Sequence, residues 1–497
     1  MAERTVFDWQ EPITWDGPGA IDGVVEKLAG DRLERARYAE FLTKYLAAEG
    51  KQRNYVLNLN AEWGAGKTWF IKRWYMELKA HYPTVYIDAW QQDFSDDPLL
   101  TVISSIIDQL KMIAGKENPI PEGMRQRLLG LFKVGGKLAL KAAIKKAGLE
   151  EDDFSLEGEE ANQLVDALCS NQKERYESIQ YLKQEIRQWV EGAVGLSEGE
   201  LDYPAFILID ELDRCRPSYA VEMLETIKHI FDIPKVVFVL ATDTEQLQHA
   251  VKVIYGADFD AHTYLSRFFS RRFSLLAGSK RHFIESNLSN SVLVDHSFDN
   301  VWPKGLNIEA ITTVLSSISD ACHLSLRSTE KLIDRMTLVL LNLEKDDINV
   351  VFLAYMLALH EIKPSDYEMI ITMARSRQKL ANVKMQEIKP KALNELQGSI
   401  YLSMRAVQGV EFVAGEYSIQ IENLIRDYLW SYLGEHNNAS VHLLEQNKIL
   451  IGQHSRFNRD EHSEALKYYI LNAELYEKSR LDMSVYRNWV ELAMSFD

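Results

Sequence analysis

The sequence has few of the features that mark exported, disulfide-stabilised or membrane-spanning chains. Its 497 residues include three cysteines, and an odd number of widely separated thiols indicates neither a disulfide framework nor a metal site. The first residues, MAERTVFDWQEP, are acidic and contain proline where a secretory signal needs a basic start and an apolar core. The longest uncharged apolar stretch, residues 348–359, is too short to cross a bilayer, so we expect a buried core helix there. These absences favour a cytoplasmic protein.

Basic charge is scarce across the chain as a whole. Lys and Arg number 56 against 73 Asp and Glu, which gives a net charge of −17 and a pI near 5.3. Because nucleic-acid binding depends on clustered cations, we do not expect general contact with DNA or RNA, and nucleic acid is the less favoured partner. With 497 residues the chain is long enough for about two to four domains, and its 46% hydrophobic content permits large cores.

The strongest local pattern is a strand, a tight loop and a helix within residues 54–75. The loop, AEWGAGKT, matches the phosphate-binding pattern G-x-x-x-x-G-K-[ST], except that Ala61 replaces the first glycine. In that pattern the lysine, here Lys67, reaches the β- and γ-phosphates, and the hydroxyl, here Thr68, is a Mg²⁺ ligand. A glycine-containing turn that binds nothing is the alternative for the loop taken alone. The predicted nucleotide-binding residues are Trp63, Gly64, Ala65, Gly66, Lys67, Thr68 and Trp69.

A second group of candidate residues lies in residues 205–217, AFILIDELDRCRP. The continuous apolar run predicts a strand buried on both faces of a parallel sheet, which places the following carboxylates in the ligand-binding crevice. Asp210 has the position of the Mg²⁺-associated acid, and Glu211 is the candidate that orients or deprotonates water, with Asp213 as a weaker second candidate. The alternative, that these acids only begin a surface loop and cap the next helix, is disfavoured by the presence of Lys67 and Thr68 earlier in the chain.

A third buried strand is predicted over residues 235–241 and is followed by Thr242-Asp243-Thr244-Glu245. Asp243 is a candidate polar sensor that contacts phosphate or the attacking water. Alternatively, Thr242 and Glu245 form a capping box at a helix start, and both descriptions can hold together.

Arginines are candidates for contact with the γ-phosphate. Arg267, Arg271 and Arg272 stand among large apolar residues, and an arginine from the same or a neighbouring subunit can stabilise transferring charge. Arg327, at the start of a predicted helix, could reach the nucleotide as a lid sensor. For each of them, a surface or ion-paired role is the alternative.

The charge of the sequence changes sign abruptly between the phosphate loop and residues 205–217. Residues 123–149 carry seven basic and no acidic residues, with four lysines at every fourth position, and an acidic run follows. On a helix this spacing gives a cationic stripe beside an apolar face, as in membrane-surface or partner-binding helices. A solvated insertion neutralised by the acidic run is the other interpretation, and it is the favoured one.

Taken together, these residues resemble the KAP family of phosphate-loop NTPases. The similar segments are AEWGAGKT, Asp88-Ala89-Trp90, IDELDRC, FVLATDTEQL, YLSRFF, LSLRSTEKLI and LALHEIKPSDY, which span roughly residues 20 to 370. The resemblance implies an ATP-dependent switch on an α/β core with a helical lid, often at the bacterial inner membrane or in defence against phage and plasmids. Many members carry transmembrane helices between the phosphate loop and the aspartate strand. This chain has the basic segment there instead, which leaves a peripheral membrane contact open.

We therefore predict an α/β protein with a P-loop NTPase core and a parallel sheet. The core is expected in residues 1–114 and 200–290, with one or two helices within 21–48 preceding the phosphate loop. A helical insertion is expected in 115–199 and a helical lid in 291–370. Residues 371–497 show helical spacing and no catalytic cluster, so they are expected to be a helical region that binds a partner or builds a homo-oligomer.

The favoured function is a Mg²⁺-dependent ATPase whose hydrolysis resets a conformational state, in anti-phage or anti-plasmid defence. A nucleotide-gated scaffold with little hydrolysis is the second hypothesis, and an ATPase that assists DNA processing is a less favoured third. The sequence does not distinguish ATP from GTP.

Overall fold

The protein is described here from a computed structural model. The described residues are 7–20, 24–95, 98–115, 172–228, 230, 232–275, 279–296, 298, 301–302, 306–343, 348–376, 399–404, 415–421, 425 and 483–495. They form two compact units, Met1–Leu276 and Ala277–Asp497, and each is treated by itself. The expected boundaries at residues 114, 199, 290 and 370 stay predictions, and the basic segment 123–149 lies outside the described residues.

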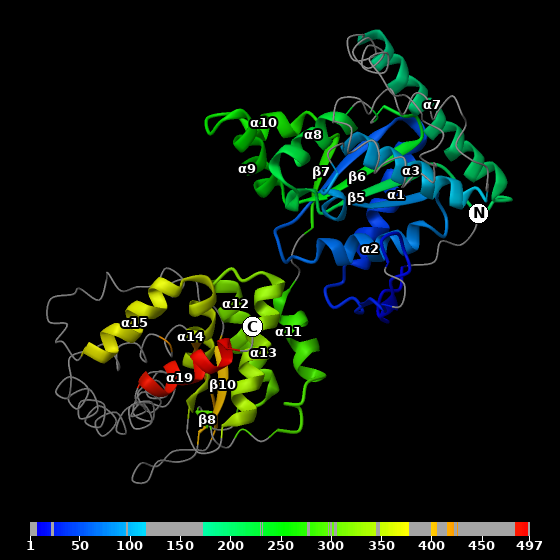
Figure 1. The fold of residues 1–497 in the computed structure, drawn as a ribbon. Coiled ribbons are helices and arrows are strands. Elements are labelled where there is room, and N and C mark those ends of the chain that lie inside the picture. Colours follow the sequence, from blue (N-terminus) through cyan, green and yellow to red (C-terminus); the bar gives the residue numbers. More distant parts are fainter. Residues whose placement is uncertain are drawn as a thin grey trace, which may run out of the picture. The chain divides into compact units, whose positions relative to one another are not determined.

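The first unit is built on a five-stranded sheet in the order β4-β5-β6-β3-β7 (Figure 1). Every neighbouring pair is parallel, as the continuous apolar runs predict. In register, Asn60 pairs with Thr242 and Asp88 with Asp210, so the strands end at one edge. That edge therefore receives the loops with the candidate residues. The strands are β3 (Tyr55–Asn60), β4 (Thr84–Asp88), β5 (Ala205–Asp210), β6 (Val236–Thr242) and β7 (Arg271–Ser274).

Helices cover both faces of this sheet because its strands carry apolar side chains on both sides. Leu57 and Leu59 of β3 pack toward α1 (Ala36–Gln52) and α2 (Lys67–Leu78), and Val56 packs on the opposite face. The opposite face is covered by α3 (Pro98–Ile113), α7 (Gln172–Leu196), α8 (Pro217–Ile227), α9 (Thr244–Tyr255) and α10 (Ala261–Ser266). The result is a three-layer α/β unit whose phosphate-loop helix is anchored in a buried core.

The segment before α1 differs from the helices expected within residues 21–48. The described part of residues 24–35 holds only the short strand β2 (Lys27–Leu28), which pairs with β1 (Ile13–Thr14), and the helix begins at Ala36. The prediction was wrong here because Val24 and Val25, counted as an apolar face, are 61% and 67% exposed. Asp31 instead fixes the helix start, since its carboxylate accepts hydrogen bonds from the amides of Leu33 (3.0 Å) and Ala36 (2.7 Å).

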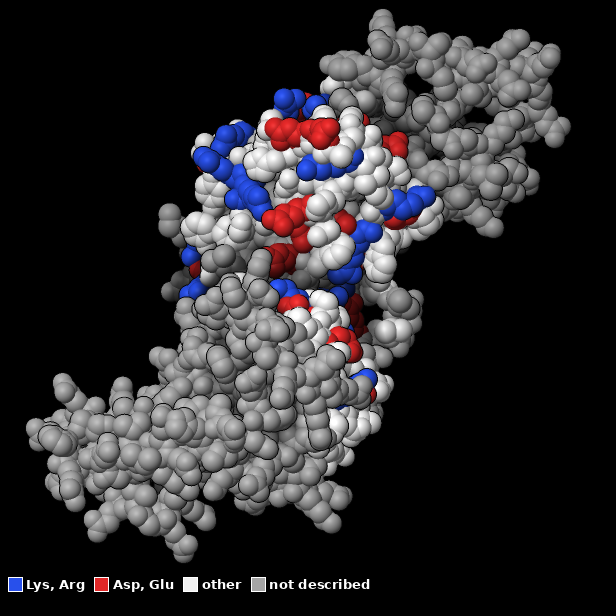
Figure 2. Space-filling model, turned by 90° about the vertical axis from the view of Figure 1, so that its left-hand side faces the viewer, with Lys and Arg blue, Asp and Glu red and all other residues white. Residues whose placement is uncertain are grey.

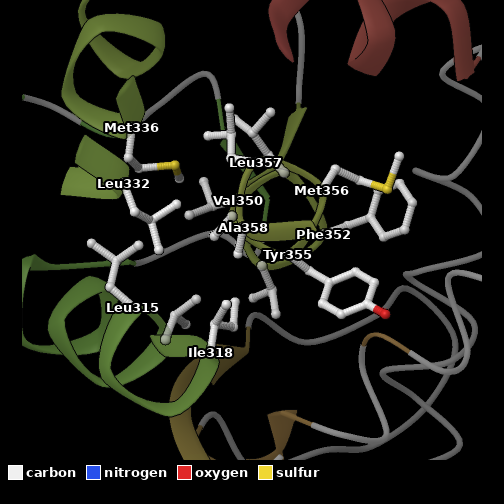
Figure 3. Packing of buried hydrophobic residues seen from close by; sticks show 14 of the residues in the cluster. Leu315, Ile318, Leu332, Met336, Val350, Phe352, Tyr355, Met356, Leu357 and Ala358 are labelled. Carbon is white, nitrogen blue, oxygen red and sulfur yellow. The ribbon is translucent and has the colours of Figure 1, made fainter. Parts of the chain in front are cut away.

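The second unit packs helices around α14 (Val350–Ile362). Residues 350–359 of this helix are all buried, which confirms the core helix expected from residues 348–359. Side chains of α12 and α13, such as Leu315 and Met336, point toward it (Figure 3). Among the described residues, no helix combines the length and apolar character needed to cross a bilayer. The other elements are α11 (Lys280–Ser289), α12 (Ile308–Ala321), α13 (Leu326–Asn342), α15 (Pro364–Ser376), α19 (Met483–Met494), β8 (Val301–Trp302) and β9 (Ile348–Asn349).

The C-terminal region is not purely helical, which corrects the expectation for residues 371–497. Strands β10 (Ser399–Met404) and β11 (Gly415–Gln420) form an antiparallel pair, with Ile400 opposite Ile419. The sequence SIYLSM alternates apolar and less apolar residues with a period of two, which is the spacing of a strand. This alternation is too short to stand out among the helical spacings of the residues around it.

Candidate active site

The phosphate loop joins the end of β3 at Asn60 to the start of α2 at Lys67. Its curvature comes from Gly64 (φ +77°) and Gly66 (φ +80°), both in the left-handed region that glycine adopts without strain. Ala61 is not among the described residues with positive φ, so alanine fits where the pattern has its first glycine. The loop therefore has the curvature that the sequence predicts.

Arg35, just before α1, donates hydrogen bonds to the backbone of the phosphate loop. This side chain is 1% exposed, and its Nη1 donates to the carbonyl oxygen of Ala65 at 2.7 Å. Burial lowers the pKa of Arg35 to about 10, while nearby Asp31 opposes the shift. A Cβ atom on Gly66 would lie 2.9 Å from the same Nη1. Sequence reasoning missed Arg35, because it precedes the loop by some thirty residues and belongs to no recognised pattern.

Lys67 is buried at the N-terminus of α2 and points back into the loop. Its Nζ donates to the carbonyl oxygens of Ala61 (2.7 Å) and Glu62 (3.3 Å) and lies 3.8 Å from Oδ2 of Asp213. The ammonium group and the first amides of the helix thus place positive charge inside the loop. This is the charge that a phosphate group would meet.

Asp210 is the last residue of β5 and Glu211 follows it, and both lie beside α2. The hydroxyl of Thr68 donates to Oε1 of Glu211, so the helix after the loop touches the acidic end of β5 directly. Asp210 is fully buried, and its pKa is raised to about 7, first by burial and then by the charge of Glu211. Burial also raises the pKa of Glu211, against opposing effects of Thr68 and Arg214.

The backbone at Glu211 is unusual, with φ +62° at a residue that is not glycine. Its amide donates to Oδ1 of Asp210 at 2.9 Å, and its carbonyl oxygen accepts from the amide of Arg214 at 3.1 Å. A single-turn helix, η4 (Leu212–Arg214), begins there. Strained residues of this kind are found where the surroundings hold a functional side chain in place.

Asp243 is the N-cap of α9 and also contacts the phosphate loop. Its carboxylate accepts from the amides of Glu245 (3.1 Å) and Gln246 (3.3 Å), and from the amide of Trp63 (3.1 Å). The capping box expected from Thr242 and Glu245 is therefore wrong, because Asp243 caps the helix itself. Thr242 ends β6 and accepts instead from the side chain of Asn58 at 3.2 Å.

Two asparagines on β3 complete the connection between the strands, and sequence reasoning missed them. Oδ1 of Asn60 accepts from the amide of Thr244 at 2.9 Å, and Asn58 is fully buried beside Thr242. A signal was present, since two amide side chains with a spacing of two stand in an otherwise apolar strand.

Asp213 and Trp63 form the rim of the site. The Trp63 indole donates to Oδ2 of Asp213, and Oδ1 of Asp213 is buried with no hydrogen-bond partner among the described residues. The Trp63 ring is 48% exposed. The loop tryptophan is thus held by an acid that also lies beside Lys67.

Other predicted residues lie away from the loop. The Trp69 indole donates to the carbonyl oxygen of Ala29 at 2.9 Å, toward the N-terminal segment. Arg267 and Arg271 are exposed, and Arg271 interacts electrostatically with Tyr55, at the end of β3 opposite to the loop. Arg327 is exposed on α13 of the second unit, whose placement relative to the first is not defined.

The residues present fit a nucleotide with Mg²⁺. Asp210 is buried and takes part in none of the ion pairs formed by the described residues. Its carboxylate accepts from the Glu211 amide (2.9 Å) and the Tyr86 hydroxyl (3.4 Å), and a hydrogen bond with Thr68 partly offsets the rise of its pKa. Among the described residues, no three His, Cys, Asp or Glu side chains converge on a metal position. The protein oxygens that would hold Mg²⁺ here are those of Thr68 and Asp210, since this ion commonly takes one or two protein oxygens together with substrate phosphates and water.

The parallel sheet, the loop with buried Lys67 and the acidic end of β5 define a P-loop NTPase domain of the α/β class. The family model described as "KAP family P-loop domain" matches residues 35–342. The chain belongs to this family, as the resemblance in sequence indicates.

Comparisons beyond the family are distant. The chain is 20% identical over 273 residues to the phage T7 exclusion protein of Escherichia coli (strain K12), which covers 52% of this chain and 35% of that protein. The chain thus spans about a third of that relative's length. Two solved structures are similar in part. The match to C. elegans PCH-2 (TM-score 0.28, 13% identity) covers 66% of this chain and 68% of the PCH-2 chain. The match to AMPPCP-bound DnaA from Aquifex aeolicus (TM-score 0.30, 10% identity) covers 90% of this chain and 93% of the DnaA chain. Both scores are too low to support an argument.

Proposed function

We propose that the chain is a Mg²⁺-dependent ATPase. The observation that carries the proposal is the contact between Thr68 and Glu211, because it joins the phosphate loop to the acidic end of β5 in one site. The fully buried Asp210 beside it, which forms no ion pair among the described residues, supports the proposal of a cation at this point. A turn that binds nothing has no need of a buried lysine beside the buried carboxylate of Asp213.

Each side chain has a defined role in the proposed reaction. Lys67 contacts the β- and γ-phosphates, while Thr68 and Asp210 hold Mg²⁺, which neutralises developing phosphate charge when bound. Glu211 orients a water molecule and accepts its proton as the water oxygen attacks the γ-phosphorus, giving ADP and phosphate. Asp243 contacts both the amide of Trp63 and the start of α9, so it couples the conformation of the phosphate loop to β6 and α9.

The product of the cycle, in this proposal, is a change of conformation in phage or plasmid defence. The name of the E. coli relative, a phage T7 exclusion protein, supports a defence role, though it is similar over only part of its length. Binding of the γ-phosphate would order the loops around Asp210 and Asp243, and hydrolysis would release them. Exposed Arg267 and Arg271 are proposed to act on a neighbouring subunit, Arg327 as a lid sensor, and residues 371–497 as the assembly or partner region.

Contact with nucleic acid is not part of the proposal. In the face drawn in Figure 2, the basic side chains of the described residues lie in separate groups interspersed with acidic ones. A broad basic surface would be needed for strong binding to phosphate backbones.

The test compares hydrolysis and binding in three proteins. We expect the wild type to release phosphate from Mg²⁺-ATP, Lys67→Ala to lose both binding and hydrolysis, and Glu211→Gln to bind ATP but to hydrolyse it at least about 100-fold more slowly. Equal hydrolysis by all three proteins would contradict the assignment. ATP binding by a wild type that releases no more phosphate than Glu211→Gln would instead support the scaffold hypothesis.

A further inference from the structure

Arg214 contacts the candidate water-activating residue directly. Its Nε forms an ion pair with Oε2 of Glu211, on the oxygen that Thr68 does not contact. The guanidinium carbon also lies 5.7 Å from the centre of the Trp90 ring, within the range of a cation–π contact. Arg214 is therefore held between a catalytic carboxylate and an aromatic ring of another loop.

The loop that carries Trp90 is fastened to the same region. Trp90 begins the short helix η1 (Trp90–Gln92), which follows β4, and Asp88 caps this turn by accepting from the amide of Gln91 at 3.0 Å. Asp93 then accepts from the amide (2.8 Å) and the Nε (2.9 Å) of Arg216. Segments after β4 and after β5 thus meet around Glu211 through two arginines with different partners.

The contacts of the Glu211 carboxylate with Thr68 and with Arg214 are expected to change differently during the proposed cycle. If Thr68 were to hold Mg²⁺, its hydroxyl oxygen would have to face the metal, and the hydrogen bond to Glu211 would be expected to weaken. Of the two side-chain contacts of the Glu211 carboxylate described above, the Arg214 pair would then be the firmer restraint on a side chain with three rotatable bonds. Each carboxylate oxygen has two acceptor positions, so Oε2 can accept from water while it stays paired with Arg214.

We propose that Arg214 is a positioning residue for hydrolysis, which fixes the Glu211 carboxylate against the attacking water, and that Trp90 in turn fixes Arg214. This inference rests on the proposed ATPase activity. Arg214 touches neither the substrate nor the reacting atoms in this scheme. It acts through Glu211, so its removal affects turnover and leaves nucleotide binding intact.

The test uses Arg214→Ala, the conservative Arg214→Lys, and Arg187→Ala as a control that removes an exposed arginine paired with Glu191 on α7. Each is measured for kcat and KM with Mg²⁺-ATP and for Kd with a labelled non-hydrolysable ATP analogue. We expect Arg214→Ala to lower kcat by about 10- to 100-fold, with KM and Kd within about twofold. Arg214→Lys should recover part of the loss, and Arg187→Ala should stay within about twofold of the wild type.

A double variant separates positioning from a general structural effect. If Arg214 acts through Glu211, then Arg214→Ala should slow hydrolysis no further in a Glu211→Gln background. Trp90→Ala should show part of the Arg214→Ala loss, and Trp90→Phe should show less.

Three outcomes would overturn the inference: an unchanged or increased kcat in Arg214→Ala, a Kd that weakens in parallel with kcat, or additive losses in the double variant. In all three the wild type still hydrolyses ATP, so the proposed function survives. A wild type no more active than Lys67→Ala overturns the function, and this inference with it.

Discussion

Replacing Gly66 by alanine should damage the phosphate loop in two ways. Gly66 has φ +80°, where an L-residue is strained, and a Cβ there would lie 2.9 Å from Nη1 of Arg35. The new methyl group must therefore displace the guanidinium that donates to Ala65 at 2.7 Å. The variant removes no side chain that contacts phosphate, so any loss of nucleotide affinity measures how much the loop conformation depends on Gly66 and Arg35.

The size of the effect follows from these two contributions. The left-handed backbone costs an alanine about 1–2 kcal/mol, and loss of a hydrogen bond from a charged donor costs about 1.5–3 kcal/mol. The total is about 2.5–5 kcal/mol against the observed loop conformation. Even if only half of it opposes nucleotide binding, the affinity falls by about tenfold or more, since 1.4 kcal/mol is a factor of ten.

The assay is titration with a fluorescent ATP analogue in the presence of Mg²⁺. Gly115→Ala is the matched control, because Gly115 also has positive φ (+67°) but nothing lies within 4 Å of its added Cβ. We expect Gly66→Ala to bind at least about tenfold more weakly and Gly115→Ala to bind like the wild type. Wild-type affinity in Gly66→Ala would refute the view that Arg35 and the glycine together hold the loop ready for phosphate.

Two further predictions concern the acids around the site. Because the pKa of Asp210 is raised to about 7 without ligand, and Mg²⁺ needs the ionised carboxylate, binding of Mg²⁺-nucleotide near pH 7 should release a proton and tighten from pH 6 to 8. Calorimetry in buffers of different ionisation enthalpy measures the release, and no release, or an equal one in Asp210→Asn, would contradict it. Asp243→Ala removes a helix cap and the acceptor for the Trp63 amide, so it should cost about 1 kcal/mol in stability and also weaken nucleotide binding. Asp260→Ala, which removes the cap of α10, should leave binding unchanged, and equal binding losses in both variants would count against a role of Asp243 in the loop.

The chemistry at the strand ends could be predicted from sequence because it depends on local patterns. The loop with Lys67 and the acids at the end of β5 each stand directly after an apolar run, and parallel strands bring such run ends to one edge. Strand β4 was predicted with its observed bounds for the same reason.

Contacts between distant segments could not be predicted in this way. Arg35 belongs to no pattern, and its pairing with the Ala65 carbonyl depends on how α1 packs below the loop. Likewise, helical spacing in residues 24–35 suggested a helix, but the segment lies along α2, where the Trp69 indole donates to Ala29. Tertiary contacts there override local spacing.

The central claim is tested most directly by phosphate release per occupied site. Wild type and Glu211→Gln are each saturated with Mg²⁺-ATP, bound nucleotide is measured, and the rate of phosphate release is divided by the occupancy. The account predicts equal occupancy and a rate at least about 100-fold lower in Glu211→Gln. Equal rates at equal occupancy would contradict the assignment of this site as the centre of ATP hydrolysis.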